Sequence, residues 1–301
     1  MFENISIIGG GLIGSSILRA INKNKIAKNV SIFDKSKEVL SFLKQENLNV
    51  NICEDLPGAV KDSEMIIIAT PLSSYKEILL SLKDVIKKDT ILTDTGSVKK
   101  EINKIIENFN FKDISWIASH PIAGTEDSGP KAGFADLFKN RWCIICPAKN
   151  AKKEDVLKVE KFWQELGSNV KSMSIEEHDY ILSLTSHLPH AIAYNIVKTA
   201  TNDKDKFKQD VIHYSAGGLR DFTRIAASDP IMWRDIFIDN SKNILEVLEK
   251  FSKNLELMKK AIKDKNGDEL VKIFSSTKEA RKEIIKAGQD TKKPDFGRKK
   301  D

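Results

Sequence analysis

A glycine-rich segment near the amino terminus constrains the fold more than any other part of the chain. A short apolar run, Asn4–Ile8, leads into Gly9-Gly10-Gly11-Leu12-Ile13-Gly14, and apolar residues at helical spacing follow. This G-x-G-x-x-G pattern between a strand and a helix is the phosphate-binding turn of dinucleotide-binding sheets. The free N–H groups at the start of such a helix bind phosphate. We therefore expect cofactor contacts from Gly9, Gly11, Leu12, Ile13 and Gly14.

An acidic residue at the end of the next apolar run supports this interpretation. The run Val30–Phe33 ends at Asp34, about 20 positions after the last glycine, where dinucleotide-binding domains bind the ribose. A carboxylate there accepts hydrogen bonds from both ribose hydroxyls and repels a 2′-phosphate. The sequence thus favours NAD over NADP, although Lys35 and Lys37 could weaken that preference. An alternative left open is that Asp34 caps the helix that follows.

Strands and helices continue to alternate along the first half of the chain. Met65–Ala69 is a continuous apolar run, as expected of a parallel strand buried on both faces, and Thr90–Thr93 is a further strand. The alternation predicts an α/β fold with a doubly wound, Rossmann-type sheet. Ligands of such sheets bind beyond the carboxyl ends of the strands. Four residues just after these two strands are therefore expected at the cofactor: Thr70, Pro71, Asp94 and Gly96.

Two polar side chains at the same edge of the sheet are candidates for chemistry. Ser97 follows the strand at Thr90–Thr93, and it either reaches the cofactor crevice or caps the helix predicted from Val98. The apolar run Ile114–Ala118 is a strand that we expect to end in a rigid loop, Ser119–Glu126. His120 in this loop is placed to meet the reactive end of a bound dinucleotide.

The remainder of the chain is predicted to be helical. After strands at Trp142 and at Asn169–Met173, only long helical patterns follow. We predict a Rossmann-type domain over residues 1–174, an all-helical domain over 175–290 and a basic, disordered tail over 291–301.

Polar groups within the helical region suggest a substrate site. Pro189 interrupts an apolar helical face between His187 and His190, and these histidines either contact substrate or pack in the core. Their spacing could serve a metal, but no nearby carboxylate completes a ligand set, so no metal is expected. Arg220 and Arg224 follow; the planar guanidinium suits a carboxylate. The alternative for this segment is a helix capped at Ser228-Asp229-Pro230, with the arginines in surface ion pairs.

The composition excludes several classes of protein. The net charge of +6 is diffuse, and no helix combines a basic face with interleaved aromatic residues, so no nucleic-acid partner is expected. The strongest apolar run is five residues long, far short of the roughly 20 that span a bilayer, so no membrane partner is expected either. No export signal is visible, which indicates a cytoplasmic location. Cys143 and Cys146 lie in one strand with their side chains on opposite faces and are interpreted as structural.

The terminal helices carry a broad apolar face. Apolar residues recur at three- and four-residue spacing from Ile244 to Ile262, and the pattern repeats over 270–285. The pattern permits a subunit interface and an intrachain core equally.

Taken together, these motifs resemble the prephenate/arogenate (cyclohexadienyl) dehydrogenase family of tyrosine biosynthesis. The glycine turn is shared by all dinucleotide-binding domains, whereas the other segments are specific in this order. The segments that carry the resemblance are Gly9–Gly14, Thr93–Lys99, His120–Gly129, Ser186–His190, Asp221–Ala226 and Ser228–Trp233.

The resemblance implies a function for these residues. It implies NAD-dependent oxidative decarboxylation of prephenate to 4-hydroxyphenylpyruvate, with arogenate as an alternative or second substrate. In the family, the histidine matching His120 draws off the proton of the ring hydroxyl, and the serine matching Ser97 supports that histidine. The arginine matching Arg224 binds a substrate carboxylate, and histidines matching His187 and His190 shape the pocket. The helical domain resembles the family's dimerisation domain, so a homodimer is expected.

Three alternatives remain open at this point. Glu126, six positions after His120, either favours the ammonium group of arogenate or pairs with Arg220. A reductase of the β-hydroxyacid dehydrogenase or pyrroline carboxylate reductase type is a second possibility, although such enzymes use a lysine or another polar group in the helical domain. A dinucleotide sensor without turnover would need the glycine turn and Asp34 but not His120.

Overall fold

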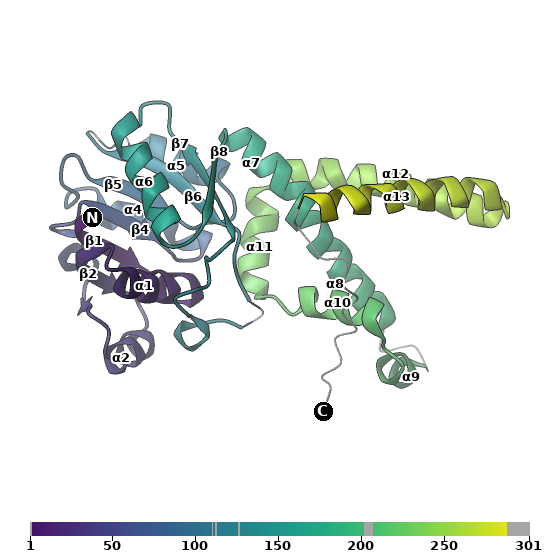
Figure 1. Cartoon of the computed structure of the whole chain (residues 1–301), viewed down its shortest axis with the longest axis horizontal. Helices are drawn as coiled ribbons and strands as arrows, with labels where there is room; N and C mark the ends of the chain where they lie inside the picture. Colours follow the sequence, from purple (N-terminus) through teal and green to yellow (C-terminus); the bar gives the residue numbers. More distant parts are fainter. Residues whose placement is uncertain (1, 110, 112, 126, 202–206, 288–301) are drawn as a thin grey trace. The chain divides into compact units, whose positions relative to one another are not determined.

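The computed structural model describes residues 2–109, 111, 113–125, 127–201 and 207–287 (Figure 1). Its contacts divide the chain into two compact units. The first comprises Met1–His187 together with Ala227–Ser241, and the second comprises Leu188–Ala226 and Lys242–Asp301. The predicted tail, 291–301, and Glu126 lie outside the described residues.

The first unit is built on one eight-stranded sheet (Figure 1). Its strands lie in the order β3-β2-β1-β4-β5-β6-β7-β8. Neighbours from β3 to β6 pair in parallel, β7 runs antiparallel to β6, and β8 is parallel to β7. The order of the first six strands is that of a Rossmann sheet, with its switch point between β1 and β4, so the predicted fold class is confirmed. The strands are β1 (Phe2–Ile8), β2 (Ala27–Phe33), β3 (Asn51–Ile52), β4 (Met65–Ile68), β5 (Ile91–Asp94), β6 (Ser115–Pro121), β7 (Trp142–Pro147) and β8 (Asn169–Ser172).

Helices cover both faces of this sheet. The core on one face includes residues of α1 and α6, and the core on the other includes residues of α3, α4, α5 and α7. The helices of this unit are α1 (Leu12–Asn24), α2 (Lys37–Gln45), α3 (Leu56–Val60), α4 (Tyr75–Leu82), α5 (Lys100–Phe109), α6 (Lys153–Glu165), α7 (Ile175–Leu182) and α11 (Pro230–Asp239). Short 3₁₀ turns lie at η1 (Leu72–Ser74) and η2 (Pro130–Ala132).

The alternation of side chains along β6 decides which face carries His120. Ile117 belongs to the core beneath α1 and α6, whereas Trp116 and Ala118 belong to the core beneath α5 and α7. Because strand side chains alternate, His120 lies on the α5 and α7 side. The same rule separates Cys143 and Cys146 into the two opposite cores, as predicted, and both thiols are buried and free.

Helix starts in this unit follow the capping signals of the sequence. Ser174 and Glu177 form a capping box that begins α7, and Asp229 caps α11 ahead of Pro230. The expected break at Pro189 takes a different form. A π-helical segment, η3 (Ser183–His187), precedes α8 (Leu188–Ala200), and Pro189 then stands in the first turn of α8, where its missing N–H costs nothing.

The described part of the second unit is helical throughout. It contains α8, α9 (Lys208–His213), α10 (Gly217–Ala226), α12 (Ser241–Lys263) from Lys242 onward and α13 (Gly267–Lys286); α8 packs against α10. Large apolar side chains of α12 and α13 are exposed, namely Leu245, Leu255, Leu257, Ile262, Val271, Phe274 and Ile284. The boundary proposed at residue 174 follows the end of the sheet, whereas contacts group α7 and α11 with the sheet. Among the described helices, none has the length and apolar character that crossing a bilayer requires.

Candidate active site

The glycine turn forms a cradle at the switch point of the sheet. Gly9 has a φ of +101°, and a Cβ placed on it would lie 2.5 Å from the carbonyl oxygen of Ala69 at the end of β4. A Cβ on Gly14 would lie 1.9 Å from the oxygen of Gly9, so α1 can approach β1 only with glycine there. A Cβ on Gly11, by contrast, would meet nothing within 4 Å. The space above Gly11, at the uncapped start of α1, therefore fits a pyrophosphate.

Asp34 joins the end of β2 to this turn. Its Oδ2 accepts a hydrogen bond from the Gly10 amide at 2.7 Å, and its Oδ1 accepts one from the Ser36 amide at 2.8 Å. The alternative role as a helix cap falls to Ser36, whose hydroxyl accepts from the Val39 amide of α2. Each carboxylate oxygen retains a second lone pair, so Asp34 can still accept hydrogen bonds from ribose hydroxyls.

The residues after β4 lie beside the glycine turn. A Cβ on Gly9 would lie 2.8 Å from the methyl group of Thr70, and the Thr70 hydroxyl accepts a hydrogen bond from Ser74 at 2.9 Å. Pro71 follows on the surface. This position beside the turn is the one predicted for cofactor-contacting residues.

Asp94, predicted to contact the cofactor, is held by hydrogen bonds within the protein. Its side chain is fully buried, and Oδ2 accepts hydrogen bonds from Lys99 Nζ at 2.7 Å, the Gly96 amide at 2.9 Å and the Tyr75 hydroxyl at 3.1 Å. Its Oδ1 accepts from the Ser119 amide at 2.9 Å. Because the carboxylate is fully buried and accepts four hydrogen bonds from protein groups, Asp94 holds the shape of this turn, and its contact with a cofactor stays a prediction. Gly96 is buried in that turn, where a Cβ would lie 2.7 Å from Leu72.

The sequence predicted that His120 lies in a loop. In the structure it lies within β6, at the carboxyl end of that strand. The strand runs on to Pro121 because β7 pairs with it up to that residue. The imidazole is 8% exposed, and its Nδ1 lies 2.8 Å from Nε2 of His178 on α7. Nδ1 of His178 in turn lies 2.8 Å from Oδ1 of Asp179. Sequence reasoning identified neither His178 nor Asp179.

Asp179 also caps the start of α5. Its Oδ1 accepts a hydrogen bond from the Lys99 amide and its Oδ2 accepts one from the Lys100 amide, both at 2.9 Å. Ser97, for which a helix cap was the alternative to a role at the cofactor, makes no hydrogen bond through its hydroxyl to another described residue and is half-buried in the turn before α5. The hydroxyl of Ser97 is therefore available to a ligand at this edge of the sheet.

The electrostatic surroundings keep the buried histidines neutral. Burial lowers the pKa of His120 well below its ordinary value, and the nearby His178, Lys99 and His187 lower it further. Burial also lowers the pKa of His178, outweighing the opposite effect of the hydrogen bond to Asp179. Burial alone would raise the pKa of Asp179, but hydrogen bonds from His178 and from the two backbone amides outweigh it and lower that pKa. The site thus combines neutral imidazoles with an ionised carboxylate near pH 7.

His187 belongs to the same unit as His120. It is buried at the end of η3, and its Nδ1 lies 3.1 Å from Nδ2 of Asn240, which also donates to the carbonyl oxygen of Asp179. Its ring packs edge-on against Trp233, with ring centroids 6.0 Å apart. Asn240 therefore links His187 to the helix that carries His178.

The other predicted substrate residues belong to the second unit. His190 is half-buried on α8. Nη2 of Arg220 on α10 lies 3.7 Å from the Asp221 carboxylate, while Arg224, one turn later, is exposed and forms no ion pair with another described residue. The guanidinium of Arg224 is available to an anionic ligand, and its role, like those of His190, Arg220 and Glu126, stays a prediction.

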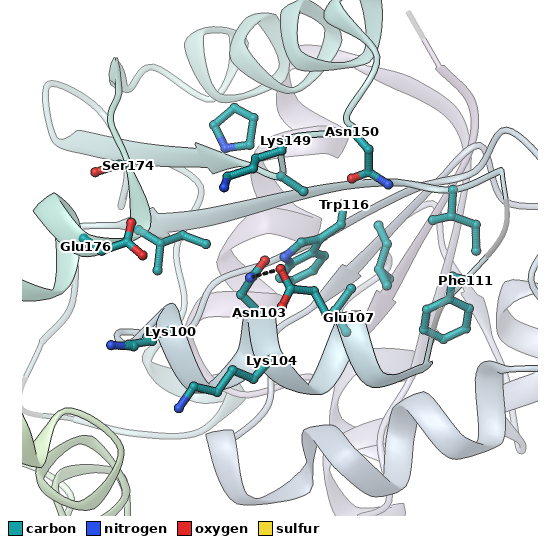
Figure 2. A pocket seen from close by; sticks show the side chains of 16 residues that line it. Lys100, Asn103, Lys104, Glu107, Phe111, Trp116, Lys149, Asn150, Ser174 and Glu176 are labelled. Carbon is teal, nitrogen blue, oxygen red and sulfur yellow. Dashed lines mark hydrogen bonds between the residues drawn. The ribbon is translucent and has the colours of Figure 1, made fainter.

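A hollow lies elsewhere on the first unit. A cavity of about 590 Å³ beside α5 is lined by Asn103, Glu107, Trp116 and Glu176 among others (Figure 2). None of the predicted site residues lines it. Among the described residues, no group of three or more His, Cys, Asp or Glu side chains is arranged to hold a metal ion.

The carboxyl edge of the sheet thus gathers the predicted chemistry of the first unit. At the carboxyl ends of the neighbouring strands β1, β4, β5 and β6 lie Gly9, Thr70, the Asp94 turn and His120. The open glycine turn, the Asp34 carboxylate and a neutral imidazole lie along one edge. Such an arrangement can bind a dinucleotide and accept a proton from a bound alcohol.

The chain is similar to known proteins over most of its length. The family profile described as "Prephenate dehydrogenase, nucleotide-binding domain" matches residues 17–172, and that described as "Prephenate dehydrogenase, dimerization domain" matches residues 174–276. The chain is 37% identical to the cyclohexadienyl dehydrogenase of Zymomonas mobilis, over 93% of this chain and 96% of that protein. It is 30% identical to the prephenate dehydrogenase of Bacillus subtilis, over 93% of this chain and 76% of that protein.

A solved structure agrees with these matches. The crystal structure of prephenate dehydrogenase from A. aeolicus, in complex with hydroxyphenyl propionate and NAD+, superposes with a TM-score of 0.86 at 31% identity. The match covers 94% of this chain and 99% of that chain.

Proposed function

The chain belongs to the prephenate dehydrogenase family, and we propose on this basis that it catalyses NAD-dependent oxidative decarboxylation of prephenate to 4-hydroxyphenylpyruvate. The observation that carries the proposal is the neutral, buried imidazole of His120 on the sheet edge that holds the glycine turn. Arogenate is the second candidate substrate, because the Zymomonas mobilis relative has the broader name cyclohexadienyl dehydrogenase.

The residues that hold the cofactor follow from the cradle. The turn at Gly9, Gly11 and Gly14 and the first amides of α1 bind the pyrophosphate, and Asp34 accepts hydrogen bonds from the adenosine ribose. Thr70 and Pro71 border the same turn. When bound, NAD accepts the hydride that leaves the ring carbinol carbon of the substrate. The A. aeolicus enzyme, whose crystal structure contains NAD+, supports this choice of cofactor.

His120 is the residue that accepts and returns the proton. Its neutral imidazole accepts the hydrogen bond of the ring hydroxyl and draws off the proton as the hydride leaves. The bond between the ring and its carboxylate then breaks, carbon dioxide departs, and the electron pair of that bond completes the aromatic ring. The phenolic oxygen takes the proton back from His120. The reaction therefore releases no net proton, and His120 returns to its neutral form within one turnover.

Other side chains bind and orient the substrate. We assign to Ser97 a hydrogen bond that supports His120 and its ligand, and to Arg224 the binding of a substrate carboxylate, since a guanidinium matches that group. His187 and His190 shape the substrate pocket, while Arg220 and Glu126 tune its charge. The chain forms a homodimer through α12 and α13, because dimerisation buries the exposed apolar side chains of these helices. A cytoplasmic location fits an enzyme of soluble acids and NAD.

The test is a spectrophotometric assay of NADH formation. We expect turnover with prephenate and NAD, weaker turnover with NADP, and a measurable ratio of kcat/KM between prephenate and arogenate. His120→Asn should lower kcat on the order of 10²-fold or more with little change in substrate KM. The proposal is wrong if neither cyclohexadienyl substrate yields NADH while a simple hydroxyacid does.

A further inference from the structure

His120 is the end of a chain of three buried side chains, and the proposed reaction uses only His120 among them. His120 contacts His178, and His178 contacts Asp179, each at 2.8 Å between the hydrogen-bonding atoms. His178 and Asp179 are at most 1% exposed. The contacts join β6 to α7 over 58 positions of the sequence. Water therefore cannot replace either hydrogen bond without rearrangement of the core.

The hydrogen-bond partners of Asp179 fix the direction of every bond in this chain. The Asp179 carboxylate accepts from two backbone amides, those of Lys99 and Lys100, so it acts as an acceptor and His178 must donate through Nδ1–H. A neutral His178 then presents a bare Nε2. The only hydrogen bond that His120 can make to a bare nitrogen is donation from its own Nδ1–H.

The consequence appears at the far side of the His120 ring. With the proton on Nδ1, Nε2 of His120 carries a lone pair and is the nitrogen that accepts a proton. We propose that His178 and Asp179 are positioning residues that hold His120 as the Nδ1–H tautomer and take up positive charge during turnover. This inference rests on the proposed function only for its kinetic part, because the tautomer exists without substrate.

The proton balance of the proposed step is simple. When Nε2 of His120 accepts the hydroxyl proton, its Nδ1 proton passes to Nε2 of His178. The positive charge then rests on His178, against the Asp179 carboxylate. Both transfers reverse when the phenolic oxygen recovers its proton. No other reactant is required.

The charges around the two rings favour this location of the positive charge. His120 lies close to the cations of Lys99 and, when protonated, of His187, both of which lower its pKa. Asp179 and Asp94 raise the pKa of His178, while burial and Lys99 lower it. The buried Cys143 thiol of β7 lies against the backbone of His120, and burial raises its pKa well above its ordinary value. The carboxylates of Asp179 and Asp94 thus favour a positive charge on His178 more than on His120.

The first experiment reads the tautomer directly. Imidazole ¹⁵N shifts of the histidine-labelled full-length protein distinguish Nδ1–H from Nε2–H, and the chain has only five histidines to assign. His120→Asn and His178→Gln identify the relevant signals. We expect Nδ1–H on both His120 and His178 near pH 7. An Nε2–H tautomer on His120 would overturn the inference, whatever the substrate is.

The second experiment separates positioning from support of the fold. His178→Leu removes the acceptor of His120 and should lower kcat about 10²-fold with substrate KM within about threefold. His178→Gln offers a carbonyl acceptor that keeps the tautomer but cannot take the proton, so it should recover part of that loss. In the His120→Asn background, His178→Leu should lower kcat no further, since it acts through His120.

Ser174→Ala is the matched control. It removes the capping box of α7, which is exposed, without touching any imidazole, and should leave kcat unchanged. If His178→Leu lowers kcat by the same factor in the wild-type and in the His120→Asn background, the role of His178 is merely structural and the proposal is overturned. If wild-type protein oxidises neither prephenate nor arogenate, the proposed function fails, and the ¹⁵N shifts alone then decide whether His178 fixes the tautomer.

Discussion

Nζ of Lys99 lies 2.7 Å from Oδ2 of Asp94, and both side chains are fully buried. The pair holds the turn between β5 and α5 against the end of β6, because Asp94 also accepts from the Ser119 amide and Lys99 donates to the Ser119 carbonyl oxygen. The placement of His120, the next residue along β6, therefore depends on a buried ion pair. Removing one partner of such a pair leaves the other charge buried and uncompensated.

Lys99→Met should accordingly destabilise the protein by about 3–5 kcal/mol. The adjacent Lys100→Met is the matched control, since Lys100 is exposed and should change the free energy of unfolding by less than about 0.5 kcal/mol. Urea unfolding of the two variants measures both values. A Lys99→Met protein as stable as Lys100→Met would show that the pair is not a determinant of this turn.

The lowered pKa values of His120 and His178 predict a pH dependence of stability. The unfolded state binds protons on both rings near pH 6.5, whereas the folded state resists protonation until lower pH. The unfolded state thus binds more protons below 6.5, and the free energy of unfolding falls as the pH falls through that value. Each histidine contributes at most about 1.4 kcal/mol per pH unit.

Urea unfolding between about pH 5 and pH 7 measures this slope. His120→Asn should reduce it by about half, because one of the two rings is gone. His213→Asn, at an exposed histidine of α9, is the control and should keep the wild-type slope. A slope unchanged by His120→Asn would contradict the assignment of this window to the buried pair.

The features of the site that depend on residues close together in the chain could be predicted from the sequence. The glycine turn, the strand ending at Asp34 and the alternation of strands and helices each follow from residues close together in the chain. Their outcome is the cradle at Gly11 and the Rossmann strand order. The helix capped at Ser228-Asp229-Pro230, an alternative that the sequence left open, likewise corresponds to the start of α11.

The remainder depends on contacts between distant segments, which no local pattern contains. His178 and Asp179 form an ordinary polar stretch of a helix until α7 docks beside β6 and α5. Asp94 was expected at the cofactor because it ends a strand, but Lys99, five positions later, encloses it. Proline and glycine after His120 suggested a loop, whereas β6 continues because β7 pairs with it beyond the last residue paired to β5.

Two glycine variants test the cofactor cradle as a matched pair. Gly11→Ala places a methyl group in open space with a φ of −66°, so it should fold normally while it blocks the approach of the pyrophosphate. We expect the KM for NAD to rise about tenfold or more, equivalent to ~1.4 kcal/mol of lost binding. Gly14→Ala should instead destabilise the fold, because its Cβ would lie 1.9 Å from the Gly9 oxygen. If both variants lower the free energy of unfolding equally, the space above Gly11 is not open.

Exposed apolar side chains on α13 test the homodimer. Val271 and Phe274 are 62% and 54% exposed and lie three residues apart, on one face of the helix. We expect light scattering to give twice the chain mass of 33.9 kDa for the wild type and a shift toward the single mass for Val271→Asp/Phe274→Asp. Ser275→Asp introduces a charge at the neighbouring exposed position and should leave the dimer intact. A wild-type protein of single mass would exclude the dimer.

The two arginines of α10 should differ in their effect on substrate binding. Arg220 lies 3.7 Å from a carboxylate oxygen of Asp221, whereas Arg224 forms no ion pair with another described residue, so its guanidinium is the one available to a substrate carboxylate. Arg224→Ala should raise the KM for prephenate on the order of 10-fold to 100-fold with little change in kcat, as expected for binding shared by the ground and transition states. Arg224→Lys should recover only part of this loss, because an ammonium group cannot form the paired hydrogen bonds of a guanidinium. Arg220→Ala serves as the comparison and should raise the KM less. Steady-state kinetics with prephenate measures the KM of both variants. An Arg224→Ala enzyme with the wild-type KM would show that Arg224 does not bind the substrate carboxylate.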